Sequence, residues 1–137
     1  MSQHKVVLLL GSNIGDTKKN VDTALENLKQ KVDIIKKTDY LLSEPVEFVS
    51  SNIFCNIAAV IYTQLSPIQL LKFIKETEFE LGRIQDSTVT IEYTDRIIDI
   101  DIVKFDELTF KSKRLGVPHK KHLFEREFSR ILLNELN

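Results

Sequence analysis

The chain has 137 residues, of which 42% are apolar and 28% are charged, and its formal net charge is −1. This composition excludes a disordered or fibrous chain, and the near-zero charge excludes a bulk attraction to nucleic acid or to a membrane surface. No run approaches the roughly 20 apolar residues that span a bilayer, and the first residues lack the apolar stretch of a signal peptide. We therefore expect a cytoplasmic protein, in which the single Cys55 is a small buried apolar residue rather than a nucleophile.

The first half of the chain predicts a strand, a helix and then further strands. The apolar run at residues 6–10 is typical of a central strand buried on both faces. A helix is expected over about residues 16–31, with apolar residues at helical spacing on one side. Residues 32–42 are rich in β-forming residues, residues 43–52 predict a loop, and the alternating residues 54–63 predict another strand.

The connection between the first strand and the first helix, residues 11–16, contains two glycines. It lacks the Gly-Lys-Ser/Thr ending of a phosphate-binding Walker A loop and does not give the G-x-G-x-x-G pattern of dinucleotide folds. We interpret it as a tight turn in which Gly11 ends the strand and Asp16 caps the helix.

A second helix is predicted to begin at Ser66-Pro67, a capping residue followed by proline at the first helical position, and to end at Gly82. Its apolar stripe is interrupted by Glu78, which stands in the last turn where a leucine would be expected. This makes Glu78 a candidate for a specific polar role.

The remainder of the chain predicts a long polar loop at residues 83–95, a strand at 97–105 and a helix at 126–136. The order β, α, β, β, α, β predicts a ferredoxin-like α+β fold, in which two helices cover one face of an antiparallel sheet. We expect a single domain over residues 1–137, because no repeat or linker divides it. Two long loops in so short a chain are expected to be functional.

Two carboxylates occupy alternate positions of the strand at residues 97–105. Because side chains alternate along a strand, Asp99 and Asp101 share one face, with their Cα atoms roughly 6–7 Å apart. Like charges this close favour a cation between them, and Mg²⁺ is suited to carboxylates together with phosphate oxygens. Taken alone, the D-x-D pattern is equally compatible with a solvent-facing strand of no special function.

A basic segment favours the functional interpretation. Residues 111–122 contain five Lys or Arg, two His and no acidic residue. Arg96 also stands shortly before the first aspartate. Carboxylates for a metal beside cations for phosphate oxygens are what phosphoryl transfer requires, because its catalysis rests on positioning and charge neutralisation.

Seven short motifs follow one another along nearly the whole chain. They are Leu10-Gly-Ser-Asn-Ile-Gly-Asp16, Ser43-Glu-Pro-Val46, Phe54-Cys-Asn56, Glu78-x-x-x-Gly-Arg83, Arg96-x-x-Asp-x-Asp-Ile-Val103, Arg114-Leu-Gly-Val-Pro-His119 and Glu125-Arg-Glu-Phe128. Together they resemble the 6-hydroxymethyl-7,8-dihydropterin pyrophosphokinase family, whose fold is ferredoxin-like. The resemblance implies transfer of a diphosphate from Mg-ATP to the hydroxyl group of the pterin, giving AMP and the pterin diphosphate in folate biosynthesis.

The resemblance also implies a role for individual residues. Asp99 and Asp101 would hold two Mg²⁺ ions. The residues implied in catalysis are Arg83, Arg96, Asp99 and Asp101. Those implied in ATP binding are Glu78, Arg83, Arg96, Arg114, His119 and Arg126. Those implied in pterin binding are Ser43, Pro45, Val46, Phe54, Asn56, Tyr93 and Phe128, with Phe54 and Phe128 on the two faces of the flat ring and the Asn56 amide at its polar edge.

Two of the chain's departures from the family pattern are insertions. The loop between Arg83 and Arg96 is longer, and an extra residue stands between His119 and Arg126. The implied partners are the small molecules ATP and hydroxymethyl dihydropterin, with no nucleic acid and no membrane, and we expect a monomer.

Two other functions are compatible with parts of the sequence. A ferredoxin-like module that binds a ligand or regulates without catalysis would leave Asp99 and Asp101 as surface residues. A nucleic-acid protein that uses the basic segment is less well supported, because that segment lacks interleaved aromatic residues.

Overall fold

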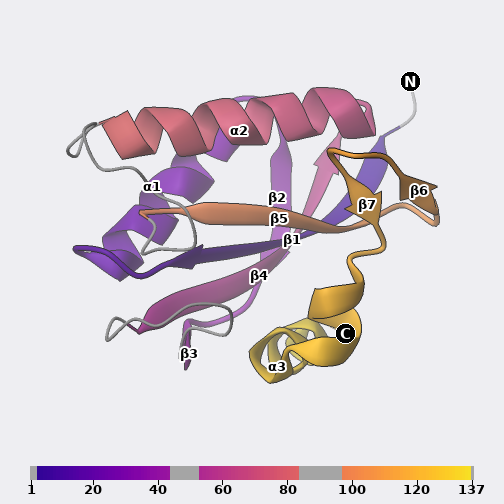
Figure 1. Ribbon diagram of the computed structural model, residues 1–137. Coiled ribbons are helices and arrows are strands. Elements are labelled where there is room, and N and C mark those ends of the chain that lie inside the picture. The colour runs from indigo at the N-terminus through magenta and orange to yellow at the C-terminus, as the bar shows by residue number, and fades with distance from the viewer. Residues whose placement is uncertain (1–2, 44–52, 84–96, 137) are drawn as a thin grey trace.

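The computed structural model describes residues 3–43, 53–83 and 97–136 (Figure 1). The elements in chain order are β1 (His4–Ser12), α1 (Thr17–Leu28), β2 (Asp33–Lys37), β3 (Leu41–Ser43), β4 (Phe54–Thr63), α2 (Pro67–Arg83), β5 (Asp99–Phe105), β6 (Phe110–Lys111), β7 (Gly116–Val117), a π-helical turn η1 (Lys121–Glu125) and α3 (Glu127–Glu135).

The main sheet has the strand order β2-β4-β1-β5, with the short β3 also paired to β4. All of its pairs are antiparallel, and β1 and β4 form its centre. Helices α1 and α2 lie together on one face of the sheet, as Figure 1 shows. The predicted α+β fold with helices packed on an antiparallel sheet is therefore confirmed.

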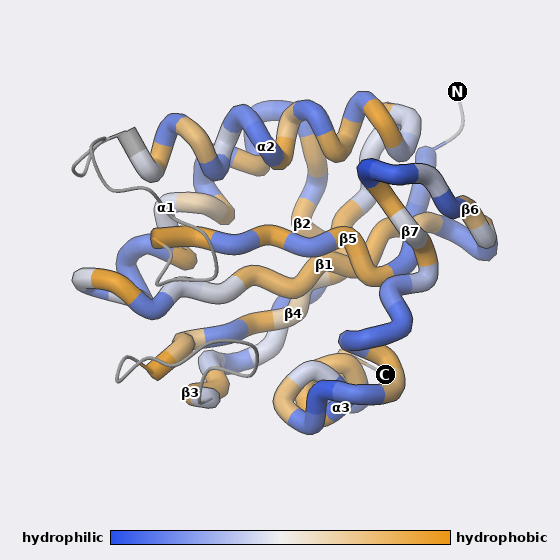
Figure 2. Tube along the Cα trace, viewed as in Figure 1, coloured by the Kyte–Doolittle hydropathy of each residue, from blue (hydrophilic) through white to orange (hydrophobic). Residues whose placement is uncertain are grey.

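The main core lies between the sheet and the helices α1 and α2. Leu8 and Leu10 of β1 are fully buried there, against the apolar stripes of the two helices. The residues of those stripes include Val21, Ala24, Leu25 and Leu28 of α1 and Leu70 and Ile74 of α2. Figure 2 shows the hydrophobic residues concentrated along the central strands. Burial of these side chains is the main stabilising contribution, at about 25 cal/mol per Å² of apolar surface.

A second, smaller core covers the opposite face of the sheet. Leu9 and Ala58 pack there with Val103 and with Leu132 of α3. The central strand is thus buried on both faces, as predicted, because α3 occupies the face that α1 and α2 leave open (Figure 1). The position of this third helix was not part of the sequence prediction.

Several local predictions are confirmed. The side chain of Asp16 accepts a hydrogen bond from the Lys19 N–H at 3.2 Å and caps α1. Ser66 Oγ accepts from the Gln69 N–H, and Gln69 Oε1 accepts from the Ser66 N–H, which forms a reciprocal cap for α2. Strand β4 has the predicted bounds, and Cys55 is buried.

The bounds of other elements differ from the prediction. Strand β1 does not stop at Gly11 but continues through Ser12, because its pairing with β4 and β5 extends that far. Helix α1 ends at Leu28, α2 continues one residue past Gly82, and β5 begins at Asp99. The basic segment contains a small hairpin, β6 and β7, that was not predicted.

The two predicted long loops lie outside the described residues, apart from their first residues, Ser43 and Arg83. None of the helices within the described ranges is long and apolar enough to cross a membrane.

Candidate active site

The pairing of the three strands β4, β1 and β5 brings the candidate polar residues together. Gly11 lies opposite Asn56 on one side and Asp99 on the other, and Leu9 lies opposite Ala58 and Asp101. Directly opposed residues project from the same face of a sheet. Asn56, Asp99 and Asp101 therefore share the face that also carries α3, while Ile100 and Ile102 enter the main core.

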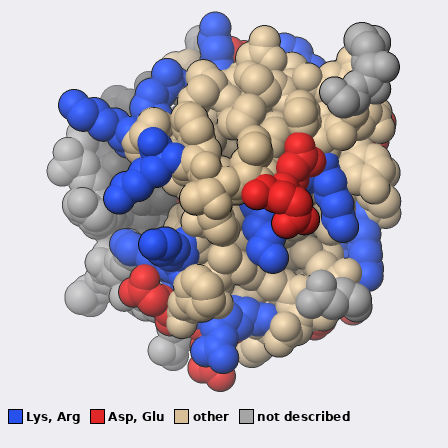
Figure 3. Space-filling model, turned by 90° about the vertical axis from the view of Figure 1, so that its right-hand side faces the viewer, with Lys and Arg blue, Asp and Glu red and all other residues tan. Residues whose placement is uncertain are grey.

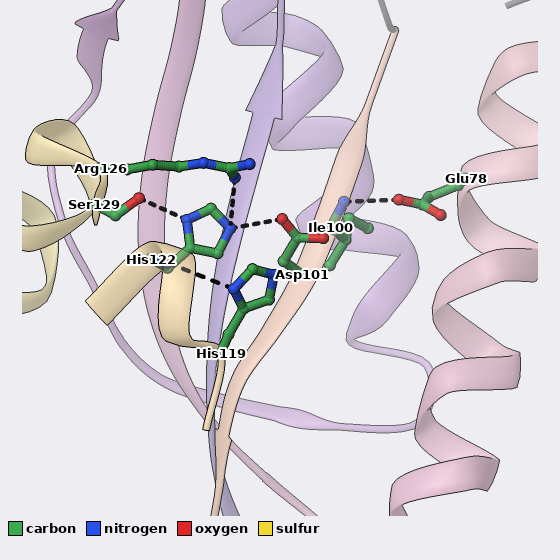
Figure 4. Close-up of polar contacts among 7 residues, drawn as sticks. All are labelled: Glu78, Ile100, Asp101, His119, His122, Arg126 and Ser129. Carbon is green, nitrogen blue, oxygen red and sulfur yellow. Dashed lines mark hydrogen bonds and ion pairs between the residues drawn. The ribbon is translucent and has the colours of Figure 1, made fainter. Parts of the chain in front are cut away.

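Asp101 is held by a residue that sequence reasoning did not single out. Its Oδ2 lies 2.7 Å from Nε2 of His122, whose Nδ1 lies 2.6 Å from Oγ of Ser129 (Figure 4). Only 3% of His122 is exposed, and Ser129 is fully buried. The chain of contacts runs from β5 through η1 to α3, so the C-terminal helix is connected directly to the carboxylate.

The charge of Asp101 is stabilised by its neighbours. Burial acts to raise the pKa of Asp101, but the hydrogen bond from His122, followed by the charge that His122, His119 and Arg126 carry when protonated, outweighs it and lowers the pKa. Asp101 is therefore a carboxylate at neutral pH, and we assign the His122 Nε2–H as the donor to its Oδ2. The Ser129 hydroxyl donates to Nδ1 when His122 is neutral with its proton on Nε2, and accepts from the Nδ1–H when His122 is charged.

His119 and Arg126 surround the same carboxylate. The ring centroids of His119 and His122 are 4.2 Å apart, and Arg126 Nη1 lies 3.3 Å from His122 Nε2 (Figure 4). Burial, followed by the nearby charge of His122, lowers the pKa of His119 despite the opposing effect of Asp101. His119 is therefore predominantly neutral at neutral pH.

An open cleft of about 610 Å³ contains the two aspartates and much of the basic segment. Asp99, Asp101 and His119 line it. The cationic side chains that line it are Lys75, Lys111, Arg114, Lys120, Lys121 and Arg126. Figure 3, which views the molecule from the side of β6 and β7, shows Lys and Arg side chains spread over much of this face. Carboxylates beside a group of cations suit a metal-bound polyphosphate.

Glu78 does not line this cleft but binds the backbone of β5 and the side chain of Lys75. Its Oε2 accepts a hydrogen bond from the Ile100 N–H at 2.7 Å, and its Oε1 lies 3.1 Å from Lys75 Nζ. Burial raises the pKa of Glu78, and these two contacts oppose the rise. Among the described residues that line the cleft, Lys75 is present and Glu78 is not.

Three of the residues expected to bind the pterin, Ser43, Phe54 and Asn56, lie at the same end of the sheet as Asp99. Asn56 Nδ2 donates to Ser43 Oγ at 2.6 Å and to the Leu41 carbonyl at 3.3 Å, and Ser43 pairs with Phe54. A methyl group at Gly11 would lie 2.7 Å from Asn56 Oδ1, so only glycine leaves room for this amide. The structure thus places Ser43, Phe54 and Asn56 together beside Gly11.

Sequence comparison decides the family. The family model of 7,8-dihydro-6-hydroxymethylpterin-pyrophosphokinase (HPPK) matches residues 7–137. The chain belongs to the HPPK family.

Relatives that carry the family name are similar over most of the chain. A 2-amino-4-hydroxy-6-hydroxymethyldihydropteridine pyrophosphokinase of Porphyromonas gingivalis is 34% identical over 133 residues, which cover 96% of this chain and 89% of the relative. The protein of that name from Bacillus subtilis is 32% identical over 131 residues, covering 94% of this chain and 75% of the relative.

Other HPPK relatives are much longer. The folic acid synthesis protein FOL1 of Dictyostelium discoideum is 33% identical over 132 residues, which cover 96% of this chain but 19% of the relative. The bifunctional protein FolKE of Lactococcus lactis is 37% identical over 123 residues, covering 88% of this chain and 34% of the relative. The chain therefore spans only a fifth to a third of the length of these two proteins.

The remaining residues implied by the HPPK resemblance are placed only in part. The rings of Phe128 and His122 are nearly perpendicular, with centroids 6.2 Å apart, and Phe128 packs against the smaller core. The proposed stacking of the pterin between Phe54 and Phe128 stays a prediction. Pro45, Val46, Tyr93 and Arg96 lie outside the described residues, as does the side chain of Arg83.

His122 and Ser129 are the described site residues that HPPK motifs did not reveal. His122 lies in η1, where the Arg126 N–H donates to the Lys121 carbonyl at 2.9 Å, five residues back. A π-helical turn accommodates one residue more than an α-helical turn. The extra residue expected between His119 and Arg126 fits this turn. That insertion was the sequence feature that could have indicated an irregular helical turn here.

Proposed function

We propose that this chain transfers a diphosphate from Mg-ATP to the hydroxyl group of 6-hydroxymethyl-7,8-dihydropterin in folate biosynthesis. Membership of the HPPK family supports the proposal. The structural observation that carries it is the shared cleft, in which Asp99 and Asp101 face Arg114, His119 and Arg126.

The donor set fits Mg²⁺. Asp101 is ionised and has one carboxylate oxygen bonded to His122, which leaves the other oxygen for a metal, and Asp99 projects from the same face two residues earlier. Oxygen donors of this kind suit Mg²⁺, which keeps part of its water shell and completes it with phosphate oxygens. When bound, Mg²⁺ would neutralise charge that develops on the polyphosphate. The expected number of two ions is part of the proposal.

The reaction is a substitution at the β-phosphorus of ATP. The pterin hydroxyl oxygen forms a bond to that phosphorus, the bond to the oxygen bridging the α- and β-phosphates breaks, and AMP leaves with the electron pair. The hydroxyl proton is released. The cationic residues of the cleft would orient the triphosphate and stabilise the charge on the leaving oxygen. Arg83 and Arg96 are proposed to add to this charge stabilisation. Glu78 is proposed to contribute to the ATP site from outside the cleft, by holding the Ile100 N–H between the two aspartates.

The pterin would bind at the end of the sheet next to Asp99. The amide of Asn56, held by Ser43, can both donate and accept at the polar edge of the ring. The absence of a side chain at Gly11 lets the ring and the amide approach the sheet. Pro45, Val46, Tyr93 and the rings of Phe54 and Phe128 are proposed to complete the pocket.

A direct assay tests the proposal. The purified chain is incubated with ATP, Mg²⁺ and the hydroxymethyl pterin, and the nucleotide products are separated. AMP in equal amount to pterin diphosphate supports the proposal, whereas ADP indicates transfer of a single phosphate. Binding of ATP without any product would instead indicate a module that does not catalyse.

We further propose that the chain acts as a monomer in the cytoplasm, on small molecules alone.

A further inference from the structure

We infer that Asp101, His119 and His122 form a binding site for a divalent transition-metal ion, with Zn²⁺ as the most suitable occupant. Each residue offers one ligand atom, and the three atoms lie within 4.8 Å of one another. Figure 4 shows both imidazole rings beside the carboxylate of Asp101. The site shares Asp101 with the proposed magnesium site but takes its other ligands from the basic segment.

The distances require only small side-chain movements. Zinc binds imidazole nitrogen and carboxylate oxygen at about 2.0–2.2 Å, so ligand atoms on one ion are separated by about 3–4 Å. Asp101 Oδ2 and His122 Nε2, now 2.7 Å apart through a hydrogen bond, would separate slightly as the ion replaces the shared proton. The ligand nitrogen of His119, which lies within 4.8 Å of the other two ligand atoms, would move toward them until the separations are about 3–4 Å.

Two features of the surroundings fit a metal-binding histidine. Ser129 Oγ lies 2.6 Å from His122 Nδ1 and fixes the ring so that Nε2 faces Asp101. A hydrogen bond to the outer nitrogen of this kind usually accompanies metal-bound histidine. His119 and Asp101 both line the open cleft, so an ion can enter and keep positions for water.

The ligand set selects against Mg²⁺. Imidazole nitrogen suits Zn²⁺, Cu²⁺, Ni²⁺ and Co²⁺, whereas Mg²⁺ prefers oxygen ligands. A transition-metal ion held by both histidines and Asp101 would withdraw that carboxylate from Mg-ATP. The resulting inhibition of diphosphate transfer rests on the proposed function, but binding of the ion does not.

The positive charge of one neighbour opposes ion binding at this site, so its removal should change the ion affinity in the opposite direction to the removal of a ligand. Arg126 Nη1 lies 3.3 Å from His122 Nε2, so its positive charge must move aside when an ion binds. Removal of that charge should therefore strengthen ion binding, while loss of any of the three ligands should weaken it.

The test uses the whole chain without nucleotide or pterin, and the probe is Co²⁺. A Co²⁺ ion with few ligands, some of them nitrogen, absorbs visible light far more strongly than Co²⁺ in water. We expect visible bands that saturate at one Co²⁺ per chain, that Zn²⁺ abolishes and that an equal concentration of Mg²⁺ leaves intact. His122→Ala and His119→Ala should each weaken binding by at least about 10-fold, since loss of an outer partner alone costs roughly 10–100-fold. Arg126→Gln should strengthen binding.

His4→Ala provides the matched control. His4 Nδ1 lies 2.6 Å from Asp106 Oδ2, and this histidine–carboxylate pair has no third candidate ligand among the described residues. The inference is overturned if no Co²⁺ bands form, if His4→Ala abolishes them, or if His119→Ala and Arg126→Gln both bind as the wild type does. His119 and Arg126 are partly exposed, so these two variants stay informative if His122→Ala does not fold. An AMP assay with added Zn²⁺ then tests the inhibition, and failure of the wild type to form AMP would contradict only the proposed function.

Discussion

The Glu78 carboxylate accepts a hydrogen bond from the Ile100 N–H at 2.7 Å, and Ile100 lies between Asp99 and Asp101 in the edge strand β5. An edge strand has no neighbour to pair its outward N–H groups. Helix α2 therefore supplies an acceptor for the N–H of the residue that separates the two carboxylates. This contact explains why a glutamate interrupts the apolar stripe of α2.

Replacement of Glu78 by alanine should destabilise the fold by about 1–3 kcal/mol, because the partly buried Ile100 N–H loses its acceptor. Glu78→Gln retains a carbonyl oxygen and should cost less. Urea unfolding measures both. Glu76→Ala, at an exposed position of the same helix, is the control and should change stability by no more than about 0.5 kcal/mol. Equal stability of the alanine variant and the wild type would contradict the anchoring role.

Asp99→Asn and Asp101→Ala should both abolish AMP formation, because each removes a proposed metal ligand. Their effects on folding should differ. Asp101→Ala removes the acceptor of the buried His122 Nε2–H and should lower the free energy of unfolding by about 1–3 kcal/mol. The sequence pattern alone predicts that neither substitution changes the folding stability much. Thermal unfolding without divalent ions distinguishes the two variants, and retained activity in either would refute the metal assignment.

Stability should depend on pH through Asp101. The pKa of Asp101 is lowered in the folded state: burial raises it, but the hydrogen bond from His122 and the nearby positive charges outweigh that effect. A carboxyl group of this kind contributes stability that is fully present above its unfolded value, roughly 3.9, and is lost as the pH falls toward the folded value. The stability difference between wild type and Asp101→Asn should therefore shrink below about pH 4. A difference that is constant from pH 3 to pH 6 would exclude this origin.

Gly11→Ala should weaken pterin binding with little effect on a non-hydrolysable Mg-ATP analogue. The added methyl group would lie 2.7 Å from Asn56 Oδ1 and displace the amide. Calorimetric titration with each ligand measures the two affinities. Gly82→Ala is the control, since no atom of the described residues lies within 4 Å of a methyl group there, and it should stabilise α2 by up to about 1 kcal/mol. Unchanged pterin affinity in Gly11→Ala would remove Asn56 from the proposed pocket.

Local features of the sequence determined the helices and strands, and they placed Asp99 and Asp101 on the same face of a strand. Cap residues such as Asp16 and Ser66 act on the backbone three residues away, so their effect is readable from nearby sequence. The alternation that places Asp99 beside Asp101 is likewise a property of any strand. The motifs indicated the family, and the match of the HPPK family model to residues 7–137 confirmed that membership.

Contacts between distant segments were decided only by the tertiary structure. Strand β1 continues past Gly11 because β4 and β5 both pair with it, and no local signal contains that register. The approach of His122 to Asp101 depends on the π-helical turn and on α3 packing against the face of the sheet opposite α1 and α2. Such contacts form where packing and register bring two surfaces together, which neither periodicity nor residue spacing along the chain encodes.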